Sequence, residues 1–389
     1  MITKISNGIV LADGREQKTN LYIKDDRILA LTDESLPFDK EIDAKGLYVS
    51  AGFVDMHLHG AAGHEFLDGT VEAYQGISAA VAQHGTTAIA PTITSSSLES
   101  MKLAIEKFEQ ALDAGVPGAK LLGIHLEGPY FAESQKGAQD ARYIRDFDPA
   151  EYEQIVAMTD HLLSWTAAPE RKGAEAFGKF MREHGILACI GHSDANCKTA
   201  HKAFENGFTH VTHLYSCTST VHRINAFRHA GIIEEAYLND DMTVEIIADG
   251  CHLPDDLLRL VYKLKGPDKV ALVTDSMRAA GMPEGSEMQL GDYGNGITVI
   301  IEDGVAKLSD RSAFAGSIAY GDRLVRNMVN MAGVPVALAV KMASENPAKF
   351  LRVENVGKLA PGYFADVTLF DKDIDIKMTM VNGKEVYRA

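Results

Sequence analysis

Apolar runs alternate with amphipathic stretches through most of the chain. The apolar runs are short and bounded by turn residues, as buried strands are. The amphipathic stretches predict helices at 70–85, 97–115, 173–185 and 195–207. Sustained over about 300 residues, this alternation indicates parallel strand–helix–strand units, which build either a (β/α)8 barrel or a doubly wound sheet.

Both ends of the chain show a different pattern, in which short strand-like runs are separated by polar turns. Residues 1–49 contain "GIVLADG" and "GLYVS", and residues 356–389 contain "ADVTLFDKD". Each end has too few strands for a stable sheet of its own. The two ends are therefore predicted to pair into one small β-sandwich domain, and residues 50–355 are predicted to form a larger α/β domain.

Composition and charge narrow the class of protein. The chain has 389 residues, of which 46% are hydrophobic and 24% charged, and no apolar run approaches the roughly 18 residues of a membrane helix. The start, "MITKISNGIVLADG", lacks the features of a secretory signal, which predicts a cytoplasmic protein. The net charge of −16, without a basic stripe, argues against nucleic acid or a membrane surface as a partner. The four cysteines lack CxxC pairing and are interpreted as reduced thiols.

Side chains with metal-binding or acid–base chemistry stand at the carboxyl ends of six apolar runs, such as "GFVDMHLHG" and "VALVTDSM". These residues are His57, His59, His125, Glu127, His192, His213, Asp249, His252 and Asp275. In a (β/α)8 barrel the carboxyl ends of all strands meet at one face, whereas a doubly wound sheet spreads them along a crevice. The pattern therefore favours the barrel, with a candidate site at that face.

The two histidines of the first run suggest a metal site. His57 and His59 are two positions apart, so both side chains point to the same face of a strand and can reach one ion. Glu127, His192 and His213 could complete one or two sites with them. Imidazole and carboxylate ligands suit zinc, iron, manganese or cobalt.

Each of these residues also has an ordinary structural interpretation. A single histidine is more often hydrogen-bonded in the core or at the surface, Glu127 could form a salt bridge, and Asp275 could cap a following helix. His125 shares the strand period of Glu127 and is interpreted as lying behind the ligands. The placement of all these residues at strand ends favours a common site over coincidence.

The ordered motifs resemble those of one known family. The motifs "GFVDMHLHG", "HLEGPY" followed by "KGA", "GHSDA", "THLY", "IADGCH" and "TDSMRAAGMPEG" resemble the N-acetylglucosamine-6-phosphate deacetylases of the amidohydrolase superfamily. A "GS" pair at 316–317 and "GKLAPGYFADVTLFD" extend the resemblance over nearly the whole chain. It implies a distorted (β/α)8 TIM barrel with a small β-sandwich, one or two divalent metal ions, and hydrolysis of the N-acetyl amide of an amino-sugar phosphate. It also implies a homodimer in which neighbouring subunits complete each other's phosphate sites.

The resemblance further assigns roles to particular residues. The implied metal ligands are His57, His59, Glu127, His192 and His213. Glu127 would be the bridging ligand, and a binuclear site is expected because both histidines of the first motif are present. Asp275 would be the general acid–base, which accepts a proton from water and delivers it to the departing amine.

The residues expected to meet the substrate depart from the family's pattern. Ser216 and Cys217 replace an Asn-Ala pair, Gln139 replaces a histidine near the acyl carbonyl, and Arg223 lies one position before the expected phosphate arginine. The candidate substrate-binding set is Gln139, Ser216, Cys217, Arg223, Arg228 and His252. These departures leave open a related amidohydrolase that acts on another acylated amino sugar or amide, with or without phosphate. A non-catalytic metal- or sugar-binding protein is the third alternative, disfavoured by the complete set of ligands.

Overall fold

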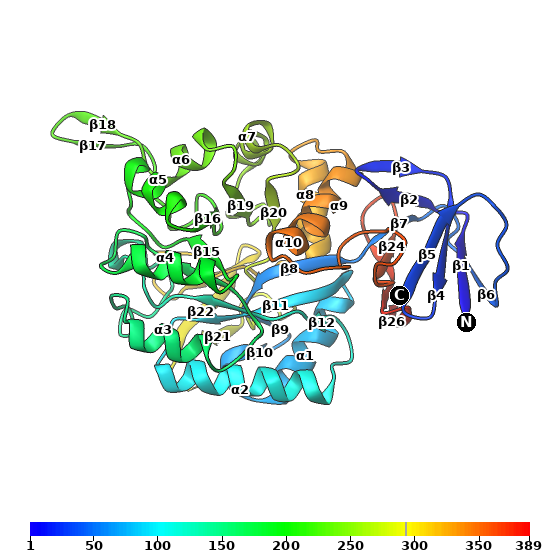
Figure 1. The fold of residues 1–389 in the computed structure, drawn as a ribbon, viewed down its shortest axis with the longest axis horizontal. Coiled ribbons are helices and arrows are strands. Elements are labelled where there is room, and N and C mark those ends of the chain that lie inside the picture. The colour runs from blue at the N-terminus through cyan, green and yellow to red at the C-terminus, as the bar shows by residue number, and fades with distance from the viewer. Residues whose placement is uncertain (292–293) are drawn as a thin grey trace.

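The structure is a computed structural model that describes residues 1–291 and 294–389. Its centre is a nearly closed barrel of parallel strands (Figure 1). The barrel strands are β8 (Phe53–Leu58), β11 (Thr86–Thr94), β13 (Ile124–Glu127), β14 (Leu162–Ala167), β15 (Leu187–Ile190), β16 (Phe208–Val211), β19 (Thr243–Ile246) and β20 (Val270–Leu272). Beyond β20, the backbone N–H of Asp275 donates to the carbonyl oxygen of His57 at 2.9 Å, which joins the last strand to the first. The predicted (β/α)8 barrel is confirmed, and the doubly wound sheet is excluded.

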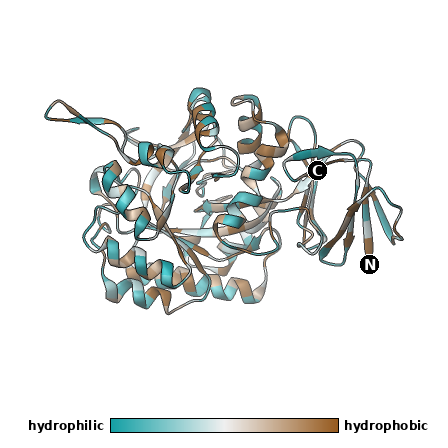
Figure 2. Cartoon of the chain, turned by 45° about the horizontal axis from the view of Figure 1, so that its top comes forward, coloured by the Kyte–Doolittle hydropathy of each residue, from teal (hydrophilic) through white to brown (hydrophobic). Residues whose placement is uncertain are grey.

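Helices surround the barrel strands in the view of Figure 2. They are α1 (Val71–Ala82), α2 (Leu98–Ala114), α3 (Pro149–Val156), α4 (Ala174–Glu183), α5 (Cys197–Glu205), α6 (Ile232–Leu238), α7 (Asp255–Lys265), α8 (Gly321–Asn330), α9 (Val336–Ala343) and α10 (Glu345–Phe350). Helix α2 illustrates why these segments are helical. The Ser97 side chain caps its N-terminus, and it buries Met101, Ile105 and Phe108 at helical spacing. The four helices predicted from the pattern correspond to α1, α2, α4 and α5.

A small β-sandwich stands beside the barrel and contains both termini (Figure 1). One sheet has the order β5-β4-β1-β6 and the other β26-β25-β24-β7-β2-β3. These strands are β1 (Ile2–Ser6), β2 (Ile9–Ala12), β3 (Arg15–Gln17), β4 (Asn20–Lys24), β5 (Arg27–Thr32), β6 (Lys40–Asp43), β7 (Tyr48–Ala51), β24 (Val367–Phe370), β25 (Ile376–Val381) and β26 (Lys384–Arg388). The two ends meet where β7 pairs with β24, in the register Val367 to Ala51. The predicted sandwich is therefore present, while a domain division at 49/50 and 355/356 stays our proposal.

The barrel carries two insertions. The pattern of apolar and polar positions did not predict them. An antiparallel sheet of β21 (Glu287–Leu290), β22 (Ile297–Glu302) and β23 (Val305–Leu308) follows the last barrel strand. A hairpin of β17 (His222–Ile224) and β18 (Phe227–His229) extends away from the barrel, at the upper left of Figure 1. Among the described residues, no helix has the length and apolar character needed to cross a membrane.

Candidate metal and active site

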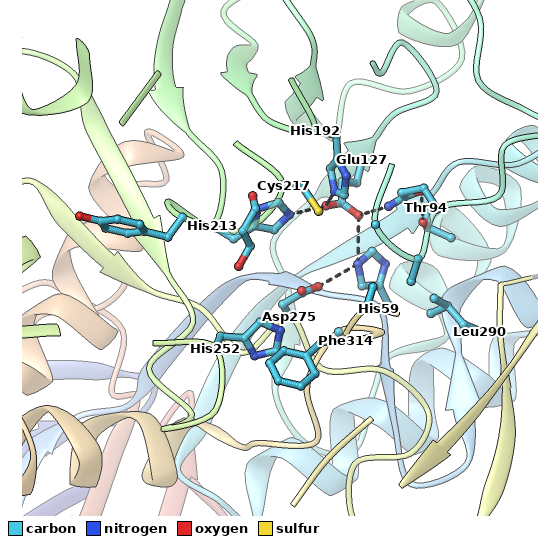
Figure 3. A pocket seen from close by; sticks show the side chains of 17 residues that line it. His59, Thr94, Glu127, His192, His213, Cys217, His252, Asp275, Leu290 and Phe314 are labelled. Carbon is cyan, nitrogen blue, oxygen red and sulfur yellow. Dashed lines mark hydrogen bonds and ion pairs between the residues drawn. The ribbon is translucent and has the colours of Figure 1, made fainter. Parts of the chain in front are cut away.

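Side chains from five barrel strands converge at one face of the barrel (Figure 3). Glu127 is the last residue of β13, and its Oε1 atom lies 3.1 Å from His192 Nε2 and 3.0 Å from His213 Nε2. Its Oε2 atom lies 3.2 Å from His59 Nε2. Asp275 Oδ1 lies 3.1 Å from the same His59 atom. The strand ends therefore bring together the residues that the sequence placed there.

His57 completes this convergence from inside strand β8. Its Nε2 atom lies 3.5 Å from Glu127 and 3.4 Å from Asp275, so His57 and His59 both face Asp275, as their spacing predicted. Two sets of three ligand atoms each lie within 4.8 Å of one another. The sets are His57, His59 and Asp275, and His57, Glu127 and His213. They share His57, which therefore stands between two candidate ion positions.

The charges of this cluster depend on one another. Burial lowers the pKa of His57, but the carboxylates of Glu127 and Glu245 more than offset it and raise that pKa to about 9. For His59, burial is likewise outweighed by Asp275 and Glu127, and its pKa rises to about 10. Burial would raise the pKa of Glu127, yet His57, His192 and His213 hold it well below its ordinary value. The buried carboxylates thus require positive charge beside them, which protons or a cation can supply.

The residues fit a divalent metal. His57 Nε2 is fully buried and, within residues 1–291 and 294–389, has no hydrogen-bond partner, although its other ring nitrogen is bonded. Burying a polar nitrogen without a hydrogen bond costs free energy, unless another group such as a metal ion binds to it. Imidazole nitrogens and carboxylate oxygens are the donors that zinc and its neighbours prefer.

Backbone hydrogen bonds place Asp275 beside these groups. No helix begins after it until α8, so the helix-cap interpretation does not apply to the described chain. The backbone N–H of Ser317 donates to the Asp275 carbonyl at 2.8 Å. Gly316 is required next to this contact, because a Cβ there would lie 2.7 Å from the Asp275 carbonyl oxygen. This close approach accounts for the glycine of the Gly-Ser pair that the sequence singled out, and the Ser317 hydroxyl donates to the Thr274 carbonyl.

The ligand cluster forms the floor of a pocket. Gln139, Ser216, Cys217 and His252 line it together with the cluster. His252 is oriented by Asp249, whose Oδ2 lies 2.8 Å from its Nδ1 atom. The other lining residues include Thr94, Tyr215, Leu290 from the inserted sheet, and Phe314, whose ring packs against His252 at 4.9 Å between centroids.

Arg223 and Arg228 are not part of this pocket. Both are exposed on the β17–β18 hairpin, where they pair directly across the two strands. Among the described lining residues there is no lysine or arginine, so His252 is the only candidate phosphate contact from the predicted set within the pocket. The hairpin carries these arginines away from the pocket of their own subunit, so their predicted contact with substrate stays a prediction.

Sequence reasoning missed Glu245, which is 1% exposed inside the barrel. Its Oε2 atom lies 3.0 Å from His57 Nδ1, and its Oε1 atom lies 3.3 Å from His210 Nε2. The first contact turns His57 Nε2 toward Glu127 and Asp275, the usual arrangement of a carboxylate behind a metal-binding histidine. The sequence did contain a signal for this residue. A glutamate within the apolar run "TVEII" would be buried, and burying its charge costs free energy unless the carboxylate is paired.

His125 lies behind the candidate ligand His57, the position interpreted for it from the sequence. Its ring packs against that of His57 at 4.6 Å between centroids, and its nitrogens lie 3.1 Å from Thr92 Oγ1 and 2.8 Å from Thr166 Oγ1. Burial, with a further contribution from His57, lowers the pKa of His125 to about 3. It is therefore a neutral support for the His57 ring.

The chain is similar to known proteins over nearly its whole length. Residues 48–386 match the model of the amidohydrolase family. The chain is 30% identical to the N-acetylglucosamine-6-phosphate deacetylase of Lysinibacillus sphaericus, over 97% of this chain and 95% of that protein. It is 31% identical to the N-acetylgalactosamine-6-phosphate deacetylase of Escherichia coli, over 85% of this chain and 86% of that one. The crystal structure of N-acetylglucosamine-6-phosphate deacetylase from Pasteurella multocida superposes with a TM-score of 0.91 at 28% identity, covering 100% of both chains.

Proposed function

The chain belongs to the amidohydrolase family, and on this premise we propose that it hydrolyses the N-acetyl amide of an amino-sugar phosphate to acetate and the free amine. One observation carries the proposal: the Asp275 carboxylate lies 3.1 Å from His59 and 3.4 Å from His57 at the floor of a pocket. An acid–base group beside a set of metal ligands is the arrangement that hydrolysis of an amide requires. The similarity to amino-sugar phosphate deacetylases over the whole barrel and sandwich supports the same reaction.

We propose that the protein holds one or two divalent ions of zinc, iron, manganese or cobalt, with two favoured. The proposed ligands are His57, His59, Glu127, His192 and His213. Glu127 is suited to serve both positions, because its two carboxylate oxygens face different histidines. When bound, such an ion polarises an amide carbonyl and lowers the pKa of water.

The chain's own residues supply the proton transfers. Burial would raise the pKa of Asp275, but His59 and His57 hold it below its ordinary value, so the carboxylate is ionised and ready to accept a proton. In the proposed reaction Asp275 takes the proton of the attacking water at a carboxylate oxygen. It then delivers that proton to the amide nitrogen, which otherwise would have to leave as an anion.

Phosphate recognition is proposed to involve two subunits. His252 lines the pocket, and the exposed arginines of the β17–β18 hairpin project away from their own barrel. The hairpin also exposes Ile224 and Phe227, apolar side chains that an interface would cover. We propose a homodimer in which Arg223 and Arg228 reach the pocket of the partner subunit. We also propose that the enzyme is located in the cytoplasm. Nucleic acid and membranes are not proposed as partners.

A second candidate is a related amidohydrolase for an unphosphorylated acyl amide. The observation that favours it is the absence of lysine and arginine from the pocket lining described by the structure. The altered residues Ser216 and Cys217 both lie in that lining, where a different substrate would meet them.

The deciding experiment measures acetate release from N-acetylglucosamine and N-acetylgalactosamine, each with and without a 6-phosphate. The protein is analysed for metal first, and a chelated sample serves as control. We expect hydrolysis of a 6-phosphate, abolished by chelation and restored by added metal. Equal rates with and without phosphate would favour the second candidate. A metal-loaded protein that hydrolyses none of the substrates would contradict both.

A further inference from the structure

The Gln139 side chain is fixed by three hydrogen bonds. It is 7% exposed. Its Oε1 atom accepts hydrogen bonds from Thr94 Oγ1 at 2.7 Å and from the backbone N–H of Ser95 at 3.1 Å. Its Nε2 atom donates to Glu127 Oε2 at 2.7 Å. Because the Ser95 N–H can only donate, the amide oxygen must face it, and the amide nitrogen must face Glu127.

This bond bears on the orientation of the central carboxylate. Glu127 Oε1 faces His192 and His213, while Oε2 faces His59. The terminal torsion of a glutamate side chain is broad and defines no single rotation of the carboxylate by itself. A donor at Oε2 selects the rotation in which the two oxygens face different histidines.

We propose that Gln139 is a positioning residue for metal binding, which holds the Glu127 carboxylate in the rotation in which one oxygen faces His59 and the other faces His192 and His213. The inference rests on the proposed metal centre, but it does not depend on which amide is hydrolysed. It differs from the interpretation of Gln139 as a substrate contact, because the amide already uses its oxygen and one N–H within the protein. A carboxamide does not titrate, so this support is the same at every pH at which the enzyme works.

The chain offers a graded series of variants. Gln139→Met keeps the length of the side chain and removes the bond to Glu127. Removing a residue that hydrogen-bonds to a metal ligand typically lowers metal affinity by about 10–100-fold. We expect Gln139→Met to weaken Zn²⁺ binding by that factor. Thr94→Val removes one of the two bonds that hold Gln139 and should cost less, because the Ser95 bond remains. If Thr94 acts through Gln139, adding Thr94→Val to Gln139→Met should change little further.

Affinity for Zn²⁺ is measured by competition with a chromophoric chelator, and metal per chain is counted after dialysis. Gln75→Met is the matched control, since its side chain donates to the carbonyl of Gly115 at the C-terminal end of helix α2. Circular dichroism and thermal unfolding of the metal-free proteins identify any variant that fails to fold, in which case Thr94→Val carries the test alone. The readout needs no substrate, so failure of the proposed deacetylation leaves it unaffected.

We expect affinity for Zn²⁺ to decrease from the wild type to Thr94→Val and further to Gln139→Met. The affinity of Gln75→Met should equal that of the wild type. Wild-type affinity in both Thr94→Val and Gln139→Met would overturn the proposal. So would a rise in KM for the substrate at unchanged Zn²⁺ affinity, which would return Gln139 to the role of a substrate contact.

Discussion

At the scale of single residues, the site uses backbone conformations that side-chain-bearing residues rarely adopt. His192, His213 and Asp275 have φ angles of 48°, 27° and 47°. A non-glycine residue in the left-handed region costs of order 1–3 kcal/mol and persists where the surrounding structure holds it. All three residues lie two or three positions after the end of a barrel strand. Left-handed turns also occur elsewhere in the chain, but at these three positions the residue that turns is itself a proposed ligand or the proposed acid–base group.

Asp275→Asn separates acid–base chemistry from assembly. Asparagine has nearly the same shape as aspartate but cannot accept the proton, so we expect kcat to fall by at least about 100-fold. Metal content and thermal unfolding should stay close to those of the wild type. The measurement is steady-state acetate release from the substrate identified in the screen. Near-normal turnover would remove Asp275 from the mechanism.

Metal affinity should rise with pH. In the metal-free protein the pKa values of His57 and His59 are about 9 and about 10, so both imidazoles hold protons at neutral pH. A cation must displace these two protons. At pH values below the pKa of a histidine, the proton displaced from it adds about one unit to the slope of log affinity against pH. His192, a third proposed ligand with a raised pKa, would release a further proton. We therefore expect a slope of at least about +2 near pH 7, which decreases as the pH approaches 9.

Isothermal titration calorimetry in buffers of different ionisation enthalpy measures the protons released directly. His201→Ala is a suitable control, because that histidine pairs with Glu235 away from the pocket. A flat or falling affinity over this range would contradict the proposed ligand roles of His57 and His59.

At the scale of elements, the β17–β18 hairpin presents two cations together. Arg223 and Arg228 are direct cross-strand partners, so their side chains leave the same face of the hairpin. An arginine fork can hold a phosphate through two parallel hydrogen bonds. In the proposed dimer, this face would supply the positive charge that the pocket itself lacks.

Replacing Arg223 with methionine should lower kcat/KM for the phosphorylated substrate by about 10–100-fold, which corresponds to roughly 1.5–3 kcal/mol. We expect Arg228→Met to have the smaller effect, because Arg223 lies closer to the position where the family has its arginine. Kinetics on the same sugar with and without phosphate check the prediction. If neither substitution changes the preference for phosphate, the hairpin has no part in recognising it.

At the scale of the whole molecule, one of the connections between the sandwich and the barrel passes through a tightly packed position. Gly52 lies between β7 of the sandwich and β8 of the barrel, and its N–H donates to the Asp366 carbonyl at 3.0 Å. A Cβ at Gly52 would lie 2.1 Å from Thr87 Cγ2 on the neighbouring strand β11. The junction therefore leaves no room for a side chain.

Gly52→Ala should lower the free energy of unfolding by about 1–3 kcal/mol, the usual cost of overpacking a dense core. Thr87→Ala removes the two nearest obstructing atoms, Cγ2 and Oγ1, and leaves the Thr87 Cβ position at 2.6 Å, so the double variant should be more stable than the sum of the two single effects predicts. Denaturant unfolding of the four proteins measures this coupling. Strict additivity would show that the clash is relieved by backbone movement instead.

The architecture and most of the site chemistry are encoded in local patterns of the chain. The spacing of apolar residues in a segment such as 97–115 sets a helix, and two histidines at strand period share a face whatever surrounds them. The convergence of strand ends follows from the parallel barrel, so Glu127, His192 and His213 could be grouped from their positions in the sequence alone. The role of Asp275 came from the match of its motif to a family and is still to be tested.

Which side chains support these groups, and which lie away from them, depends on the tertiary fold. Glu245 reaches His57 across 188 positions of sequence, and Gln139 reaches Glu127 from a loop without regular structure. Arg223 is close to the metal motifs in sequence and yet stands on an exposed hairpin. The physical reason is that hydrogen bonds and ion pairs act over about 3 Å. Contacts of that length depend on strand register, loop path and left-handed turns, which a pattern of hydrophobic and polar positions does not specify.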